Sequence, residues 1–88
     1  MTEDDFNALC REKGYGDIKI KSYDPDGYDP MHTHDLSIIG LVLEGQMTLE
    51  WEDGSTTYKP GDICEFAAGA LHAEKTGPNG ARIILGFK

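Results

Sequence analysis

The sequence has few of the features that mark membrane or secreted proteins. No run approaches the roughly 20 apolar residues needed to span a bilayer. Residues 1–12 carry acidic side chains and no apolar signal segment. The two cysteines, Cys10 and Cys64, do not make a disulfide framework. We therefore expect a cytoplasmic protein in which both thiols are reduced.

Basic residues are also scarce. Eight Lys and Arg stand against sixteen Asp and Glu, which gives a formal net charge of -8. Such a charge repels the phosphates of nucleic acids and anionic lipid headgroups. We expect neither nucleic acid nor a membrane as a partner, and the acidic surplus indicates no particular function beyond solubility.

The chain is long enough for one hydrophobic core and too short for two, since it has 88 residues. Its hydrophobic content of 39% is that of a folded protein. Most of the eleven glycines and four prolines separate short apolar runs, which is typical of short strands joined by turns. The composition predicts an all-β sandwich or barrel as a single domain over residues 1–88.

One helix is predicted, at residues 3–13. Thr2 and Asp5 have the spacing of an N-terminal capping box, and Phe6 and Cys10 share a face of the helix. Gly14 can end it. We expect residues 1–16 to form this helix and a turn, lying against a barrel made by residues 17–88.

From residue 17 the apolar period changes to two. Ile18 and Ile20 alternate with Lys19 and Lys21, which predicts a half-buried first strand. A loop is predicted next at 24–30, then a strand at 31–44 and a turn at Gly45. A hairpin follows, with strands at 46–51 and 56–59 around a type I′ turn at Asp53-Gly54. The remaining predicted elements are a turn at 60–62, a strand at 63–66, a loop at 67–71, a strand from His72, a turn at 78–80 and a closing strand at 82–87.

The three histidines are the residues most suited to chemistry. His32 and His34 are one residue apart in a predicted strand, so both imidazoles project to the same side, about 6 to 7 Å apart. Neutral imidazoles at that spacing can converge on one metal ion. Two surface histidines at a strand edge would give the same pattern. His72, which follows a small-residue loop at the start of a later strand, is the third candidate.

In this setting the sequence resembles the cupin superfamily. The first cupin motif reads glycine, five residues, HxH, three or four residues, glutamate, six residues, glycine. The second reads glycine, five residues, proline, any residue, glycine, two residues, histidine, three residues, asparagine. The matching positions are Gly27 (one residue too close), His32, His34, Gly45, Gly61, Gly69 and His72. The resemblance covers about residues 18–87 and implies a double-stranded β-helix, or jelly-roll barrel, whose histidines point inward at a divalent metal ion.

The sequence differs from the cupin motifs at three positions, one of which is the usual carboxylate ligand of the metal ion. Ile38, or Ile39 with the longer spacing, takes the place of the glutamate, while Ala67 replaces the proline and Thr76 the asparagine. A three-histidine site without glutamate resembles the cupins that include thiol dioxygenases, which hold ferrous iron. Iron, zinc, nickel and copper all accept imidazole, so the ligands do not distinguish them.

Four other residues are weighed for the site. Glu74 shares the face of His72 if that strand is regular, so it is a candidate fourth ligand or a hydrogen-bond partner of the ligands, unless it lies in water at the barrel mouth. Asp35 directly follows His34, so in a strand its side chain should point away from the metal. Gln46 faces either the cavity or solvent. Cys64 is either a small inward hydrophobe or a redox-active thiol near the metal.

These observations favour a small metal-binding cupin with three histidines inside the barrel, and the first hypothesis is a dioxygenase-like enzyme acting on a small molecule. A small-ligand binding or sensing module without catalysis is the alternative, and a metal-free structural dimer is a third. No catalytic residue is identified, because no tyrosine and arginine pair can be placed at the pocket from Tyr23, Tyr28 and Arg82. We also expect a homodimer formed through barrel strands. Four apolar residues are expected in the core or in that contact: Leu36, Ile38, Met47 and Trp51.

Overall fold

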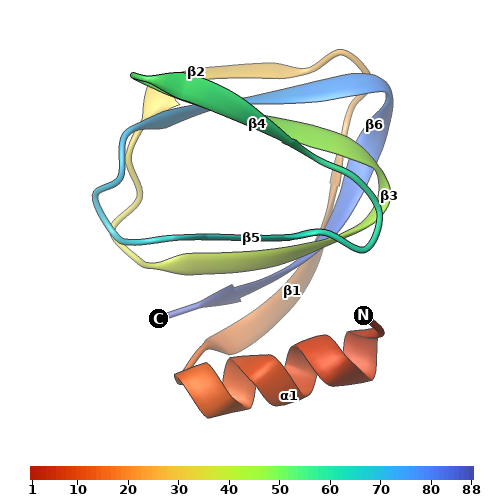
Figure 1. Cartoon of the computed structure of the whole chain (residues 1–88), viewed down its shortest axis with the longest axis vertical. Helices are drawn as coiled ribbons and strands as arrows, with labels where there is room; N and C mark the ends of the chain where they lie inside the picture. Colours follow the sequence, from red (N-terminus) through yellow and green to blue (C-terminus); the bar gives the residue numbers. More distant parts are fainter.

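The computed structural model describes residues 1–88 as a β-barrel with one helix outside it (Figure 1). Its elements in chain order are α1 (Glu3–Lys13), β1 (Gly16–Tyr23), β2 (Tyr28–His32), β3 (Ile38–Trp51), β4 (Gly54–Tyr58), β5 (Ile63–Phe66) and β6 (His72–Phe87). All strand pairs are antiparallel. The strands curl around a central space, and α1 lies beneath them in the view of Figure 1. The all-β barrel with a short N-terminal helix is therefore confirmed.

Two long strands, β3 and β6, form the framework. They pair along both of their halves, residues 38–45 with 81–87 and residues 47–50 with 73–76. The shorter strands complete the barrel on either side. β1 pairs with the second half of β6 and β2 with its first residues, while β5 and β4 pair with the first and second halves of β3. The last strand, β6, thus pairs both with β1 and β2 near the N-terminus and with β3 in the middle of the sequence.

The turns predicted at Gly45 and at residues 78–80 are wrong, because β3 and β6 continue through these positions without reversing direction. The register between the two strands shifts on both sides of Gly45. Gly45 has φ 71°, and a Cβ there would collide with the carbonyl oxygen of Gly80. The glycines therefore let two backbones approach closely and bend together as a bulge, rather than reverse the chain.

Other boundaries also differ from the predictions. The predicted loop at 24–30 contains the start of β2, at Tyr28, and the single strand predicted at 31–44 is divided by a loop at 33–37. Between β3 and β4 the two turn residues are Glu52 and Asp53, since Trp51 pairs with Gly54. The non-glycine residues with positive φ are Asp17 and Asp26, so this hairpin turn is not the predicted type I′.

The predicted helix is confirmed at residues 3–13. The Thr2 hydroxyl accepts from the backbone N–H of Asp5, and the Asp5 carboxylate accepts in return from that of Thr2, at 3.1 and 3.2 Å. Gly14 ends the helix in a left-handed conformation. Phe6 and Cys10 are fully buried against the outer face of the sheet. They form one core cluster with Tyr15, Ile39, Leu41 and Ile84.

Strand β1 presents the opposite face to the one that its sequence suggests. Lys21 pairs with Ile83 and lines the barrel interior together with it, so the odd-numbered residues of β1 face inward. Ile18 and Ile20 face outward and are 41% and 49% exposed. The strand predicted from residue 17 is present, and the register with β6, rather than the apolar alternation, sets which of its side chains face inward.

The barrel interior has its own core. Its cluster consists of Val42, Met47, Leu49, Cys64, Ala81 and Ile83. Of the four apolar residues predicted for the core or a dimer contact, Ile38 and Met47 are buried and Trp51 is half-buried, whereas Leu36 is 49% exposed in the 33–37 loop. Phe66 and Trp51, which pack against this interior core, also contact His72.

Candidate metal site

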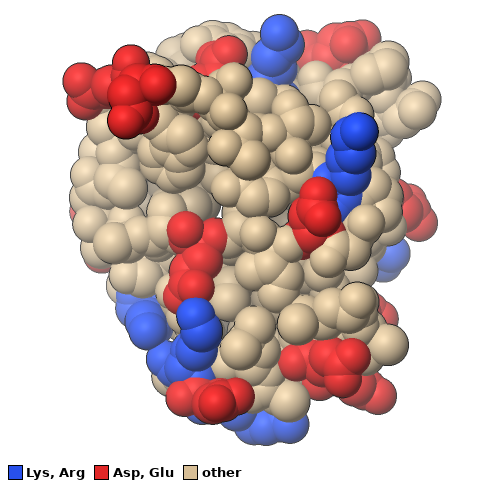
Figure 2. Space-filling model, viewed as in Figure 1, with Lys and Arg blue, Asp and Glu red and all other residues tan.

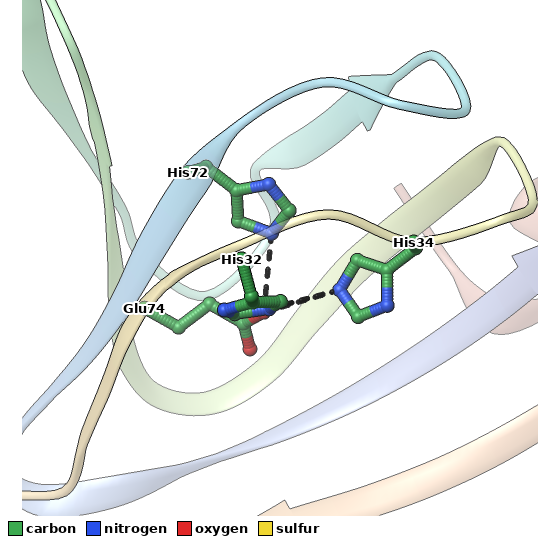
Figure 3. Close-up of side chains that lie close together, drawn as sticks. All are labelled: His32, His34, His72 and Glu74. Carbon is green, nitrogen blue, oxygen red and sulfur yellow. Dashed lines mark hydrogen bonds and ion pairs between the residues drawn. The ribbon is translucent and has the colours of Figure 1, made fainter.

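Four side chains converge at one end of the barrel: His32, His34, His72 and Glu74 (Figure 3). His32 ends β2, His34 lies in the loop that follows, and His72 and Glu74 are the first and third residues of β6. One potential ligand atom from each residue lies within 4.8 Å of those of the others. The pairing of β2 with β6, which sets His32 opposite His72, brings these segments together.

Glu74 lies at the centre of this cluster. Its Oε2 atom is 2.9 Å from Nε2 of His32, 3.2 Å from Nε2 of His72 and 3.5 Å from Nε2 of His34. The Glu74 side chain is 15% exposed, so it is largely removed from water. The cupin position for a carboxylate, residue 38, is an isoleucine that lines the cavity. In this chain the carboxylate beside the histidines therefore comes from β6.

Backbone carbonyls orient two of the imidazoles. Nδ1 of His32 lies 2.6 Å from the carbonyl oxygen of Pro30, and Nδ1 of His72 lies 3.0 Å from that of Ala70. Because a carbonyl oxygen only accepts, each Nδ1 carries a proton and donates it. In the neutral imidazole this leaves the Nε2 lone pair directed at Glu74.

Two contacts of the cluster then set an acceptor against an acceptor. Nε2 of His32 and Nε2 of His72 lie 2.9 and 3.2 Å from the Glu74 carboxylate, while Nε2 of His34 lies 3.1 Å from that of His32. The two contacts with the carboxylate repel unless a positive charge lies among them. An additional proton on His32 would satisfy its own contacts but leave Nε2 of His72 facing the carboxylate. One metal ion satisfies all four donors, and three imidazoles with a carboxylate suit a divalent transition metal.

The pKa of His32 is raised. The hydrogen bond to the Pro30 carbonyl is the main cause, and the negative charges of Glu74 and Asp29 add to it. Asp29 approaches His32 at 3.8 Å. In the absence of a metal ion this environment therefore favours the protonated imidazole, with which a metal ion must compete.

Aromatic rings cover His72, which is completely buried. Its ring centroid lies 4.4 Å from that of Phe66 and 5.3 Å from that of Trp51. This packing leaves Nε2 directed toward the cluster. His72 is therefore the most rigidly held of the three imidazoles.

The cluster opens into a cavity of about 150 Å³ inside the barrel. Its polar lining consists of Lys21, Tyr23, Asp29, His34 and Glu74. The apolar lining consists of Ile38, Met47, Leu49, Cys64, Phe66, Ile83, Leu85 and Phe87. A second cavity of about 200 Å³ shares the polar wall and continues between β1, β2 and β6. The space beside the cluster thus has one polar and one apolar side.

Cys64 and Tyr23, which were both considered from the sequence, line the 150 Å³ cavity. Cys64 is buried, and burial raises the pKa of its thiol to about 11, so it is protonated at neutral pH and acts as a small hydrophobe. Burial also raises the pKa of Tyr23. Gln46 lies against Gly77 and lines neither cavity, and Asp35 is exposed and outside the cluster.

His34 lies outside the strand that was predicted to carry both His32 and His34. Only His32 belongs to a strand, so strand alternation does not place the two rings on one side. The 33–37 loop turns His34 back, and its carbonyl oxygen accepts a hydrogen bond of 2.9 Å from the backbone N–H of Gly69. Two loops that are distant in sequence thereby hold the HxH segment beside His72.

The outer surface shows no single charged region on the face drawn in Figure 2, where acidic and basic side chains are interspersed. No helix is both long and apolar enough to cross a membrane.

Comparisons with known proteins agree with this geometry. The family model of the cupin domain matches residues 20–84. No curated protein matches the chain. Among solved structures, a protein of unknown function from Rhizobium leguminosarum bv. viciae 3841 superposes with a TM-score of 0.75 at 21% identity, over 80% of this chain and 66% of that one.

Two other solved structures are similar. An RmlC-like cupin from Shewanella frigidimarina gives a TM-score of 0.68 at 20% identity, over 80% of this chain and 62% of that one. The polyketide cyclase RemF from Streptomyces resistomycificus gives 0.67 at 27% identity, over 80% and 52%. The chain spans less than two thirds of the length of each of these proteins. The match to the family model, which extends from β1 to β6, shows that the chain belongs to the cupin family.

Proposed function

We propose that this cupin binds one divalent metal ion through His32, His34, His72 and Glu74 and presents it to a small molecule in the barrel. The convergence of three imidazole nitrogens and one carboxylate oxygen around one point carries the proposal, because a single metal ion would satisfy all four. Iron, zinc, nickel and copper all accept this donor set.

A bound ion would polarise a ligand oxygen or lower the pKa of a bound water. The chain's own residues set the conditions for it. Glu74 contributes a negative charge that a site of three neutral imidazoles lacks, so less of the ion's charge is left for an incoming ligand. The resemblance to thiol dioxygenases rested on that three-imidazole set, and Glu74 weakens it. We therefore propose a metal-dependent reaction on a small molecule, for which a dioxygenase-like step is one candidate.

The similarity to RemF, a polyketide cyclase, supports catalysis on a small organic molecule. One observation favours the alternative of a binding or sensing module without catalysis. Burial raises the pKa values of Tyr23 and Cys64 in the cavity, so both stay protonated at neutral pH. Neither is therefore poised as a general base.

We also propose that the chain forms a homodimer through the outer face of β1. β1 is an edge strand of the sheet. Its outward isoleucines, Ile18 and Ile20, are 41% and 49% exposed. An edge strand with exposed β-branched residues gains from burial against another copy.

Metal content tests the main proposal. Protein purified without an affinity tag is analysed for bound metals, stripped with a chelator and titrated with Co²⁺ and Zn²⁺. We expect one ion per chain. Saturation at a hundredfold excess over Kd should stabilise the fold by about 2.7 kcal/mol, which corresponds to a rise in Tm of roughly 10 to 20 °C.

Glu74→Gln is the informative variant, because it keeps the size of the side chain and removes its charge. We expect Kd for Zn²⁺ to rise by about tenfold to a hundredfold, the range seen when hydrogen-bond partners of metal ligands are lost. Glu52→Gln, in the exposed turn between β3 and β4, is the matched control and should leave Kd unchanged. No binding by the stripped wild-type chain would overturn the metal proposal. Equal Kd values for both variants would exclude Glu74 as a ligand.

A further inference from the structure

The cavity contains one cation that is not paired with an acid. Lys21 lines both cavities and forms no ion pair, whereas Lys13 is bound to Glu65 and Lys19 to Asp17. Within the chain, the Lys21 ammonium lies 4.8 Å from the ring centroid of Tyr23, an uncharged partner. An ammonium group in this position is available to an anion that enters from solvent.

The register of β1 brings this lysine inward at the expense of apolar burial. A shift of one residue would turn Ile18 and Ile20 into the barrel and the lysines out to water. In the observed pairing Lys21 lines the cavities while staying exposed to solvent, and Ile18 and Ile20 face outward, 41% and 49% exposed. Leaving two isoleucines about half exposed is unfavourable for packing alone, so the position of Lys21 at the cavities points to a role there.

The charges around the cavity also favour an anion. In the 150 Å³ cavity, Glu74 and Asp29 would offset the two positive charges of a divalent ion in the site, and the charge of Lys21 would be left over. Asp24 lines the second cavity, so the surplus positive charge is confined to the first. The Tyr23 hydroxyl remains protonated because burial raises its pKa, and it can donate a hydrogen bond to an oxyanion.

The opposite wall determines the rest of the ligand. It is formed by aliphatic and aromatic side chains from β3, β5 and β6. A ligand that fills the space would place an apolar body against this wall and direct its polar end toward Lys21 and Tyr23. The two-sided lining is not suited to sugars or other molecules that are polar throughout.

We propose that Lys21 is the residue that selects the ligand, and that this ligand is a small organic monoanion, such as a carboxylate, with an apolar body. Lys21 pairs with the anionic group at the polar wall shared by Tyr23 and the histidine cluster. The proposal rests on the proposed metal-binding function for the charge balance, but the position of Lys21 does not depend on the ion.

Binding of benzoate tests this, with benzamide as a neutral probe of the same shape. Zn²⁺ binding is first measured separately, and then both probes are titrated into zinc-loaded and zinc-free protein by calorimetry. Lys21→Met should weaken benzoate binding about fivefold to tenfold, as expected for one partly exposed charge-assisted hydrogen bond. Lys21→Arg should restore it. Benzamide binding should be the same in all forms.

Lys59→Met is the matched control, because it changes the net charge equally at an exposed position in the turn after β4. An equal loss of benzoate affinity in the Lys59 variant would reduce the effect to overall charge and overturn the proposal. Unchanged benzoate affinity in Lys21→Met, or no benzoate binding to the zinc-loaded wild type, would also overturn it. Zinc-free protein should bind benzoate more weakly, because Glu74 and Asp29 then outweigh Lys21. If the chain fails to bind Zn²⁺, the metal site alone is overturned, and the ratio of wild-type to Lys21→Met affinity for benzoate in the zinc-free protein decides the present proposal.

Discussion

Gly45→Ala is expected to destabilise the barrel far more than a glycine substitution of the same backbone geometry elsewhere. Gly45 has φ 71°, and an added Cβ would overlap the carbonyl oxygen of Gly80 and lie 3.0 Å from Cα of Ala81. Both neighbours are backbone atoms of β6, so no side-chain rotation relieves the contact. Gly14 has φ 83° with nothing within 4 Å of an added Cβ, and it provides the control.

Two separate costs determine the expected loss of stability, one from the left-handed backbone and one from the clash with β6. A left-handed backbone costs a non-glycine residue about 1 kcal/mol or somewhat more, part of which is offset by the reduced entropy of the unfolded chain. Gly14→Ala should show this cost alone. Gly45→Ala should add about 1 to 3 kcal/mol for forced displacement of packed backbone. For a domain of this size, each 1 kcal/mol lowers Tm by about 4 to 8 °C.

Thermal and urea unfolding followed by circular dichroism compare wild type with both variants. We expect a fall of roughly 5 °C in Tm for Gly14→Ala and of about 10 to 25 °C for Gly45→Ala. The urea m-value should be unchanged if the folded barrel keeps its compactness. Equal shifts in the two variants would refute the idea that close approach of β3 and β6 at Gly45 shapes the barrel.

Two other predictions concern the helix and the assembly. Hydrogen bonds from Lys13 and Tyr15 hold the pKa of Glu65 below its usual range, so its stabilisation is complete above about pH 4.5 and is lost as pH falls through the lowered value. Glu65→Gln should therefore be less stable than wild type by about 0.5 to 1 kcal/mol at pH 7, with urea curves that approach each other in acid; a difference that does not shrink as the pH falls below 4.5 would contradict this. Ile20→Lys should convert the proposed dimer into a monomer in sedimentation experiments, and a wild type that is monomeric at 100 µM protein, on the order of a weak-dimer concentration, would argue against the dimer.

Local signals in the sequence were sufficient for the helix. Thr2, Asp5 and Gly14 specify both of its ends through contacts within a few residues, so its bounds follow from the sequence alone. The strands were harder because their limits depend on distant partners. Gly45 looks locally like a turn residue, and only the approach of Gly80 from a strand far along the chain makes it a bend.

The parity of β1 was not predictable for a related reason. Alternation of isoleucine and lysine identifies a strand but is the same whichever face turns inward. Pairing with β6, which lies at the other end of the sequence, decides that Lys21 faces the cavity. The cost of exposing Ile20 appears only in the folded chain.

For the site, the motif spacing was sufficient to identify the three histidines, but not the carboxylate. The cupin pattern directs attention to position 38, where the chain has an isoleucine. Glu74 could be found only by its spacing of two from His72 in a regular strand, a signal that many surface glutamates share. Its contacts with all three imidazoles became evident only once β2 was paired with β6.

The arrangement of the four donors in the chain also has a topological consequence. They come from just two short segments, 32–34 and 72–74, so a shared ion would close a loop that contains β3, β4 and β5. Like a reversible cross-link, it would lower the entropy of the unfolded chain more than a clip between near neighbours would, because the cost of closure grows with loop length. Metal supply would then act on when this barrel can fold, as well as on what it can bind.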